Sequence, residues 1–288
     1  MSHEPHTSGA TPATSWAPVS SGLGAIEFYS VNYAVQAPQS IVRQLTADDD
    51  RTRRDALNAL GVPTQYTAKN VAAPKPHSVH MELAPLGTSD EMDALLTVEL
   101  DHHLVTAVLV PNGSEWHRLA TVIFPTAFAD ASSTPSTFLR TNRSMLDPLK
   151  YRAVFRVREN QANGDFQENE AHVRVLNNRA IVTVSFVSGS RRCEVSSKKQ
   201  RGTCEITRRW LEPDHTAPAG TRRFQMVTAV GHIAGKDSDD PLADARFFQL
   251  SRLREFSCQP LVFSDTMLRY DPAGPNGTCP YTGTRTPR

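Results

Sequence analysis

Apolar and polar residues alternate along two neighbouring runs in the middle of the chain, residues 171–175 and 180–186. A period of two is typical of β-strands that bury one face, whereas a helix repeats its apolar positions every three or four residues. Asn177 and Asn178 lie between the runs, and asparagine tolerates the positive φ that a two-residue type I′ turn requires. The pattern therefore predicts a β-hairpin. Its register pairs Val175 with Ala180, Val173 with Val182 and Ala171 with Val184 on an apolar face, and Arg174 with Ile181 and His172 with Thr183 on a mixed face.

A second block of alternating residues spans 79–125 and predicts a meander of three or four strands. A turn at Asp101 and His102 would place apolar residues opposite each other, and Asn112-Gly113 is the strongest turn signal in the chain. The register implied by the first turn pairs Val98 with Val105, Leu96 with Ala107 and Ala94 with Leu109. Runs of strand composition at 204–211 and 223–230 extend the sheet that the 171–186 hairpin begins.

The clearest helical signal lies at residues 46–60. Thr46 is a suitable N-cap, and Asp49 stands three residues later, which is a variant of the capping box. The three aspartates at 48–50 occupy the first turn, where the helix dipole favours negative charge. Gly61 is a stop signal. The acidic run therefore indicates a helix cap in preference to a metal site.

Together these elements predict an α+β protein, predominantly antiparallel β, with one or two packed sheet modules and few short helices. Residues 1–22 are rich in Ser, Thr, Ala and Pro, a composition typical of a disordered tail. The predicted division of the remainder is a β-rich module at 23–125 with its helix near 46–60, a connecting loop at 126–149, an antiparallel sheet module at 150–270 and a second tail at 271–288.

The cysteines are Cys193, Cys204, Cys258 and Cys279, and no two of them form a Cys-x-x-Cys motif, so a zinc ribbon or a thioredoxin-type site is not indicated. Cys193 ends one predicted strand and Cys204 begins the next, which favours a disulfide between them and leaves the other two to pair. The alternative is four reduced thiols in a cytosolic protein. Because disulfides persist in oxidising compartments, the pattern favours an exported protein. Residues 1–22 contain no Lys or Arg and no apolar block, so we expect no signal peptide within this chain.

Charge and motifs narrow the function classes further. The formal net charge of +1 argues against a nucleic-acid partner. No apolar run approaches the ~20 residues that a membrane-spanning helix needs. The chain has no phosphate loop, dinucleotide fingerprint, Gly-x-Ser-x-Gly or His-Glu-x-x-His, which removes the easily recognised enzyme classes and gives no reason to expect a cofactor.

Three groups of side chains are candidates for chemistry. His172 lies on the mixed face of the central hairpin and could act as a general base if a cavity forms there; otherwise it is a polar residue of an exposed sheet face. Asp101, His102 and His103 are of the types that bind zinc or copper, but adjacent histidines in a strand-like turn point to opposite sides.

The third group is a basic cluster that we assign to the loop between the first two cysteines. It consists of Arg191, Arg192, Lys198, Lys199 and Arg201. A loop of this kind, held by a disulfide, could bind phosphate, sulfate or an acidic polymer. The alternative is a solvated hairpin tip whose charges keep the sheet edge from aggregating.

The run Glu170–Phe186, followed by residues 206–210 and 224–227, has a strand, a tight turn, a strand that ends in an apolar run, and then a strand with a tryptophan. In this order the segment resembles the sheet half of NTF2-like (SnoaL-like) domains. The resemblance implies a curved sheet with a cavity behind it. Such domains range from enzymes to binding modules, so the resemblance assigns no activity.

From the sequence we therefore expect a non-catalytic exported protein that acts by binding or as a structural module, in the cell envelope or the extracellular space. The sequence does not identify its partner, for which an envelope component and another protein are both open. The alternative is a small-molecule-binding or enzymatic domain with a cavity behind the C-terminal sheet. A deep apolar pocket into which His172 or Arg174 and a carboxylate point would favour the alternative, and a filled core would favour the first hypothesis.

Overall fold

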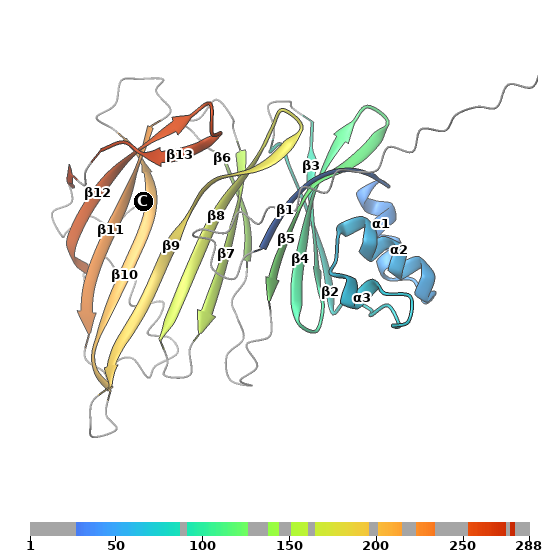
Figure 1. Cartoon of the computed structure of the whole chain (residues 1–288), viewed down its shortest axis with the longest axis horizontal. Helices are drawn as coiled ribbons and strands as arrows, with labels where there is room; N and C mark the ends of the chain where they lie inside the picture. Colours follow the sequence, from blue (N-terminus) through green and yellow to red (C-terminus); the bar gives the residue numbers. More distant parts are fainter. Residues whose placement is uncertain are drawn as a thin grey trace, which may run out of the picture.

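A computed structural model describes residues 27–86, 91–125, 138–143, 151–160, 165–195, 201–214, 223–233, 253–274 and 277–279 (Figure 1). The described chain is mostly antiparallel β-sheet with three helices, which confirms the predicted α+β class. The predicted tail at 1–22 lies outside these residues. None of the helices within them is long and apolar enough to cross a membrane.

The strands form a five-stranded sheet and a nine-stranded sheet. The first has the order β1-β5-β4-β3-β2 and is built from β1 (Glu27–Val35), β2 (Ser78–Ala84), β3 (Asp93–Glu99), β4 (His103–Asn112) and β5 (Glu115–Pro125). The second has the order β13-β12-β11-β10-β9-β8-β7-β6, with β14 paired to β12, and is built from β6 (Phe138–Arg143), β7 (Tyr151–Asn160), β8 (Phe166–Leu176), β9 (Arg179–Val195), β10 (Arg201–Pro213), β11 (Arg223–Ile233), β12 (Leu253–Ser264), β13 (Arg269–Pro272) and β14 (Gly277–Thr278).

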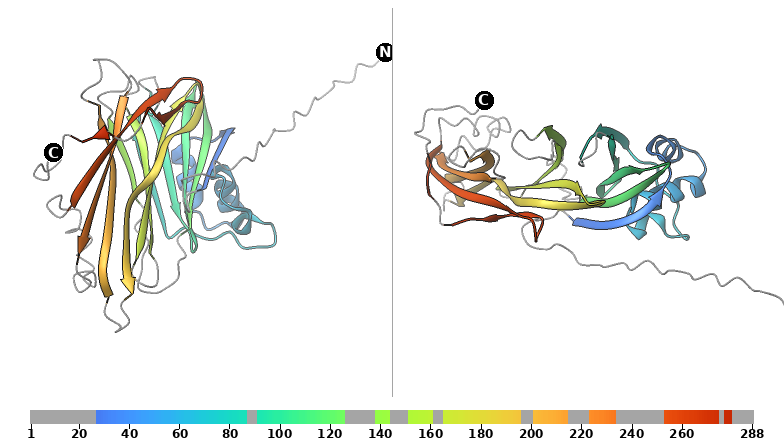
Figure 2. Two further views of the ribbon diagram at one scale, coloured as in Figure 1. Left: turned by 60° about the vertical axis from the view of Figure 1, so that its left-hand side comes forward. Right: turned by 90° about the horizontal axis from the view of Figure 1, so that it is seen from above.

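The helices cover one face of the five-stranded sheet (Figure 2). They are α1 (Pro38–Leu45), α2 (Asp50–Leu60) and α3 (Thr64–Thr67). Ile41, Leu57 and Leu60 pack in one cluster with the strand residues Leu96 and Leu109, and all five are fully buried. Alternation along β3 and β4 supplies the sheet side of this core, while the apolar stripe of each helix supplies the other side.

The opposite face of the five-stranded sheet packs on the nine-stranded sheet. Val108 and Val122 from the first sheet share a core with Phe155, Val173 and Val175 from the second. The backbone N–H of Val175 also donates to the carbonyl of Leu86, at 3.3 Å, and so joins the second sheet to the segment that follows β2. The order of layers at this point is helix, sheet, sheet.

Both predicted hairpins form. Asn177 and Asn178 adopt φ of 51° and 55°, as a type I′ turn requires. The β3–β4 register is the predicted one, with Val98 opposite Val105, Leu96 opposite Ala107 and Ala94 opposite Leu109. The turn after β4 differs from the prediction by one residue. Asn112 pairs with Glu115, so the turn residues are Gly113, at φ 64°, and Ser114.

The start of the main helix was predicted incorrectly. Asp49, not Thr46, is the N-cap of α2, and its carboxylate accepts a hydrogen bond from the backbone N–H of Thr52 at 2.7 Å. Thr46 instead follows the last residue of α1, where its hydroxyl donates to the carbonyl of Arg43 at 3.0 Å. Both residue types cap helices well, and the helix that precedes Thr46 decides which of the two is used.

Two predicted non-sheet segments contain strands. The segment 126–149 includes β6, which pairs with β7, and the segment 271–288 includes the end of β13, all of β14 and Cys279, which is disulfide-bonded. The remaining residues of the predicted connecting loop lie outside the described part of the chain. A short strand that pairs along one edge needs little hydrophobic periodicity of its own, so the sequence pattern does not indicate it.

The C-terminal end of α2 depends on a close contact with β5. Arg118 donates to the carbonyls of Asn58 and Ala59, and Thr121 donates to that of Leu60 at 2.9 Å. The Asn58 carbonyl also accepts the backbone N–H of Gly61, so the side chains of the sheet add partners to the last carbonyls of the helix. Gly61 ends the helix with φ 74°, and a Cβ placed on it would lie 2.5 Å from Thr121 Oγ1 and 2.6 Å from Arg118 Nη1.

We expect Gly61→Ala to destabilise the protein through both backbone strain and crowding. Gly113→Ala is the matched control, because Gly113 also has positive φ but a Cβ there would meet no atom within 4 Å. Left-handed backbone strain alone costs about 1–2 kcal/mol, and overpacking adds about 1–3 kcal/mol. Urea unfolding of the two variants should therefore give a clearly larger loss of unfolding free energy for Gly61→Ala. Equal losses would contradict the proposed contact.

Candidate functional site

The candidate site is a row of ionisable side chains along β8. Glu168, Glu170, His172 and Arg174 occupy alternate positions, so the pleat places all four on the face directed away from the five-stranded sheet. This mixed face was predicted to be exposed unless a cavity forms. Instead the four residues are 3%, 7%, 3% and 1% exposed. The opposite face of β8 carries the apolar residues that pack between the two sheets.

Two β-bulges in β9 determine what lies beside this row. His172 pairs with Val184 and not with Thr183 as predicted, because Thr183 is an extra residue in β9. The Thr183 hydroxyl donates to the carbonyl of His172 at 3.2 Å. Beyond the bulge the register is one residue off the predicted one, so that Ala171 faces Ser185 instead of Val184. A shift of one residue exchanges the faces of a strand, and the bulge thereby moves Val184 to the side of His172.

The same bulge places Phe186 opposite Glu170, and the ring of Phe186 lies 5.9 Å from that of His172. Val184 and Phe186 belong to a cluster with Phe224 and Tyr270, where β13 comes close to β9 (Figure 2). The rings of Phe224 and Tyr270 meet edge to face, with centroids 5.0 Å apart. One flank of the polar row is therefore closed by packed aromatic residues.

Glu170 and His172 form a buried acid–base pair. Nε2 of His172 lies 2.7 Å from Oε1 of Glu170, within the same strand. Such a pair holds one proton between Nε2 and the carboxyl oxygen: either an imidazole N–H donates to the carboxylate, or a protonated carboxyl group donates to Nε2. Held in this way, the imidazole has a fixed orientation, which is what a general base needs, but a general base must also reach a substrate.

Glu168 joins three strands. Its Oε1 accepts a hydrogen bond from the hydroxyl of Ser188 at 3.0 Å and another from Nη1 of Arg208 at 3.1 Å. Ser188 is the extra residue of the second bulge, and Gly189 lies between Glu168 and Arg208 in the register. Because glycine has no side chain, the guanidinium of β10 can cross β9 to the carboxylate of β8. This charged pair is largely buried, with side-chain exposures of 23% for Arg208 and 4% for Glu168.

The predicted basic cluster is not a single loop. Arg191 and Arg192 belong to β9, where neighbouring side chains point to opposite faces, and Arg201 belongs to β10. Arg191 is buried, and its guanidinium lies over the ring of Phe166, 5.3 Å from the ring centroid. Arg192 is exposed. Lys198 and Lys199 lie outside the described residues. β9 therefore continues past the point where the sequence pattern placed the loop. Arg191 can be buried within it because its guanidinium stacks on the ring of Phe166.

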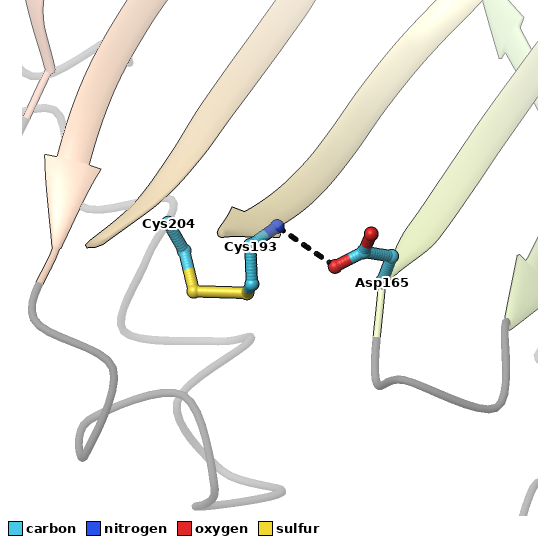
Figure 3. Close-up of a disulfide and its surroundings, with 3 residues drawn as sticks. All are labelled: Asp165, Cys193 and Cys204. Atoms are coloured by element: carbon cyan, nitrogen blue, oxygen red, sulfur yellow. Dashed lines mark hydrogen bonds between the residues drawn. A yellow bond between two sulfur atoms is a disulfide. The ribbon is translucent and has the colours of Figure 1, made fainter. Parts of the chain in front are cut away.

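Both predicted disulfides are present. Cys193 and Cys204 are cross-strand neighbours in β9 and β10 (Figure 3). Cys258 is bonded to Cys279. The backbone N–H of Cys193 donates to the carboxylate of Asp165 at 2.9 Å, which ties the end of β9 to the residue just before β8 (Figure 3). Each disulfide lies in a small apolar cluster of the nine-stranded sheet.

The weak metal candidates do not meet at one point. Nδ1 of His103 lies 2.9 Å from the hydroxyl of Tyr66, whereas Asp101 lies 2.7 Å from Nε2 of His77 and His102 is exposed. Burial lowers the pKa of His103, and the charge of Glu27 partly offsets this effect. Within the part of the chain that the structure describes, no group of three or more His, Cys, Asp or Glu side chains is placed to hold a metal ion.

Of the polar row, the sequence singled out only His172 and Arg174. Glu168 and Glu170 could have been found, since the alternation of ionisable residues at 172 and 174 continues back to 168, beyond the predicted strand at 171–175. Ser188 and Arg208 could not, because their contacts with Glu168 depend on a bulge and on a strand that lies two places away in the sheet.

The two disulfides differ in access, and this predicts the order in which they are reduced. Cys193 is half-buried, whereas Cys258 and Cys279 are buried together with Trp210 and Phe256. An attacking thiolate must reach a sulfur atom. Limited reduction of the folded protein, followed by alkylation and mass spectrometry, should label Cys193 and Cys204 first. In urea, where both disulfides are accessible, the difference should disappear; earlier labelling of Cys258 in the folded protein would contradict this assignment.

The comparisons with known proteins add no relationship to this geometry. No protein-family model matches the chain, and neither a curated protein nor a solved structure matches it. The resemblance of residues 170–230 to NTF2-like domains therefore stays a prediction. What can be inferred about function rests on the residues and contacts described above.

Proposed function

We propose that this chain is an exported protein, periplasmic or extracellular, that acts by binding or as a structural module and not by catalysis. The observation that carries the proposal is the pairing of all four cysteines in two disulfides. Disulfides persist in oxidising compartments and are rare in the cytosol, where thiols are kept reduced. A protein stabilised in this way is suited to the cell envelope or the extracellular space.

The non-catalytic part of the proposal rests on burial. His172 and Glu170 are 3% and 7% exposed, and their polar atoms contact each other inside the nine-stranded sheet. Glu168 is likewise engaged by Ser188 and Arg208. A general acid or base has to lie within hydrogen-bond reach of its substrate, whereas Glu170 and His172 are engaged with each other and Glu168 connects neighbouring strands.

Thiol trapping of the protein isolated from its natural source tests the proposed compartment. Cells are lysed directly into an alkylating reagent, and the intact mass is measured with and without prior reduction. We expect no alkylation before reduction, since each of the four cysteines has lost its hydrogen to a disulfide, and four modifications afterwards. Four alkylated cysteines without reduction would overturn the assignment to an oxidising compartment. A protein that is oxidised only after lysis is excluded by the immediate trapping.

The second candidate function is a small-molecule-binding or enzymatic domain that uses the row on β8. The observation that favours it is the concentration of Glu170, His172 and Arg174 on one buried face beside aromatic residues. Buried ionisable groups gather at functional sites, although structural networks also contain them. The two roles predict opposite effects on stability.

Glu170→Gln separates these roles. If the Glu170–His172 pair is structural, removing its charge weakens a buried charged hydrogen bond and lowers the unfolding free energy by about 1–3 kcal/mol. If the pair serves a substrate, its replacement leaves stability unchanged or raises it, because functional groups are held at a cost to stability. Glu99→Gln is the matched control, a strand glutamate whose hydrogen bond from the Ser78 hydroxyl is open to solvent. We expect urea unfolding to show a clear loss for Glu170→Gln and a change within about 0.5 kcal/mol for Glu99→Gln.

A further inference from the structure

The strand β2 forms one edge of the five-stranded sheet. It pairs with β3 along its whole length, from Ser78 opposite Glu99 to Ala84 opposite Asp93, without a bulge. On its other side the described residues provide no strand. A regular edge of this kind presents backbone N–H and C=O groups that can pair with another strand.

Other edge strands in the described chain carry features that discourage such pairing. The register of β1 is interrupted between Ser30 and Tyr33, and β13 is short and ends in Pro272. Bulges, charged residues, proline and shortness are the usual means by which proteins protect an edge. Residues 78–84 contain no Lys, Arg, Pro or Gly.

The sequence of β2 complements itself when two copies lie antiparallel. Met81 is the central residue of the strand, and pairing two copies about it aligns all seven residues. The register then places His80 opposite Glu82 of the second copy, Val79 opposite Leu83 and Ser78 opposite Ala84, each pair occurring twice by symmetry. An imidazole N–H can donate to a carboxylate, so the polar pair is favourable. Moving the centre by one residue, to His80 or to Glu82, loses this pair and shortens the ladder.

Exposed apolar residues mark the same edge. Leu83, within β2, is 45% exposed. Val79 and Met81 are only partly buried against the helix-side core. In the paired arrangement Leu83 gains an apolar neighbour, Val79 of the second copy, on the face that the helices cover.

From these observations we infer that a second copy of this chain pairs along β2, antiparallel and centred on Met81, to join the two five-stranded sheets into one. Pairing along β2 does not require that the protein be exported, so the thiol-trapping result and the oligomeric state are independent of each other.

Charge exchange across the symmetry axis tests the register. Sedimentation velocity over a concentration series should show a dimer for the unmodified protein. His80→Glu places two carboxylates opposite each other at both pairs, and we expect it to raise the dimer dissociation constant about tenfold or more. The double variant His80→Glu with Glu82→Lys restores opposite charges and should recover most of the affinity. His102→Glu, an equal change of charge at the exposed β3–β4 turn, should have no effect.

Cross-linking gives a second readout that does not depend on affinity. All four native cysteines are paired, so Met81→Cys introduces the one reactive thiol, and this thiol faces its own copy across the axis. Mild oxidation should yield a covalent dimer of Met81→Cys but not of Val79→Cys, which faces Leu83 instead. A protein that stays monomeric at its highest soluble concentration, a dimer that His80→Glu does not weaken, or preferential cross-linking of Val79→Cys would each overturn the inference.

Discussion

The bulge at Thr183 is the constraint on which the arrangement of the nine-stranded sheet depends. On the turn side of it, β9 contributes Ala180 and Val182 to the core between the two sheets. Beyond it, Val184 and Phe186 belong to a separate cluster on the other face. A strand without the extra residue would keep one set of side chains on one face throughout. The β8–β9 hairpin can therefore contribute to two apolar clusters, because one extra residue in β9 exchanges the two faces of that strand midway along it.

The same exchange determines where charge can be buried. Arg174 pairs with Ile181 on the turn side of the bulge, whereas His172 and Glu170 face Val184 and Phe186, which β9 brings to this side only after its register has shifted. Removing an ion from water costs several kcal/mol, so these groups need partners close at hand. Ser188, supplied by the second bulge, and Arg208, which crosses Gly189, provide them for Glu168. The irregularities in β9 and the buried charges in β8 thus depend on each other, and neither would be favourable alone.

Sequence reasoning succeeded where a local signal decides the structure. The Asn177-Asn178 turn fixes the four pairs of the β8–β9 ladder between the turn and the bulge, and Gly61 ends α2 as predicted. Sequence reasoning failed where the structure is decided by a contact between residues that are far apart in the chain. Nothing near Thr183 signals the bulge, which is stabilised across the ladder by the carbonyl of His172. Arg191 was assigned to a solvated loop because arginines are usually exposed, but Phe166 covers its guanidinium. The candidate site depends on both kinds of signal. Its strand, β8, was therefore predictable, whereas the hydrogen bonds that connect β8 to β9 and β10 were not.

The disulfides lie in the part of the molecule where the apolar clusters are smallest. The five-stranded sheet has helices on one face and the second sheet on the other, and it contains no disulfide. In β10–β12 the apolar clusters are small, and two of them include a disulfide. Bridges that close loops with sequence separations of 11 and 21 contribute about 3 kcal/mol each in the chain-entropy model. That contribution is large beside the stability of a typical domain, about 5–15 kcal/mol. Covalent links therefore supply, where the core is thin, the stability that layered packing supplies elsewhere, and this half of the molecule depends most on an oxidising environment.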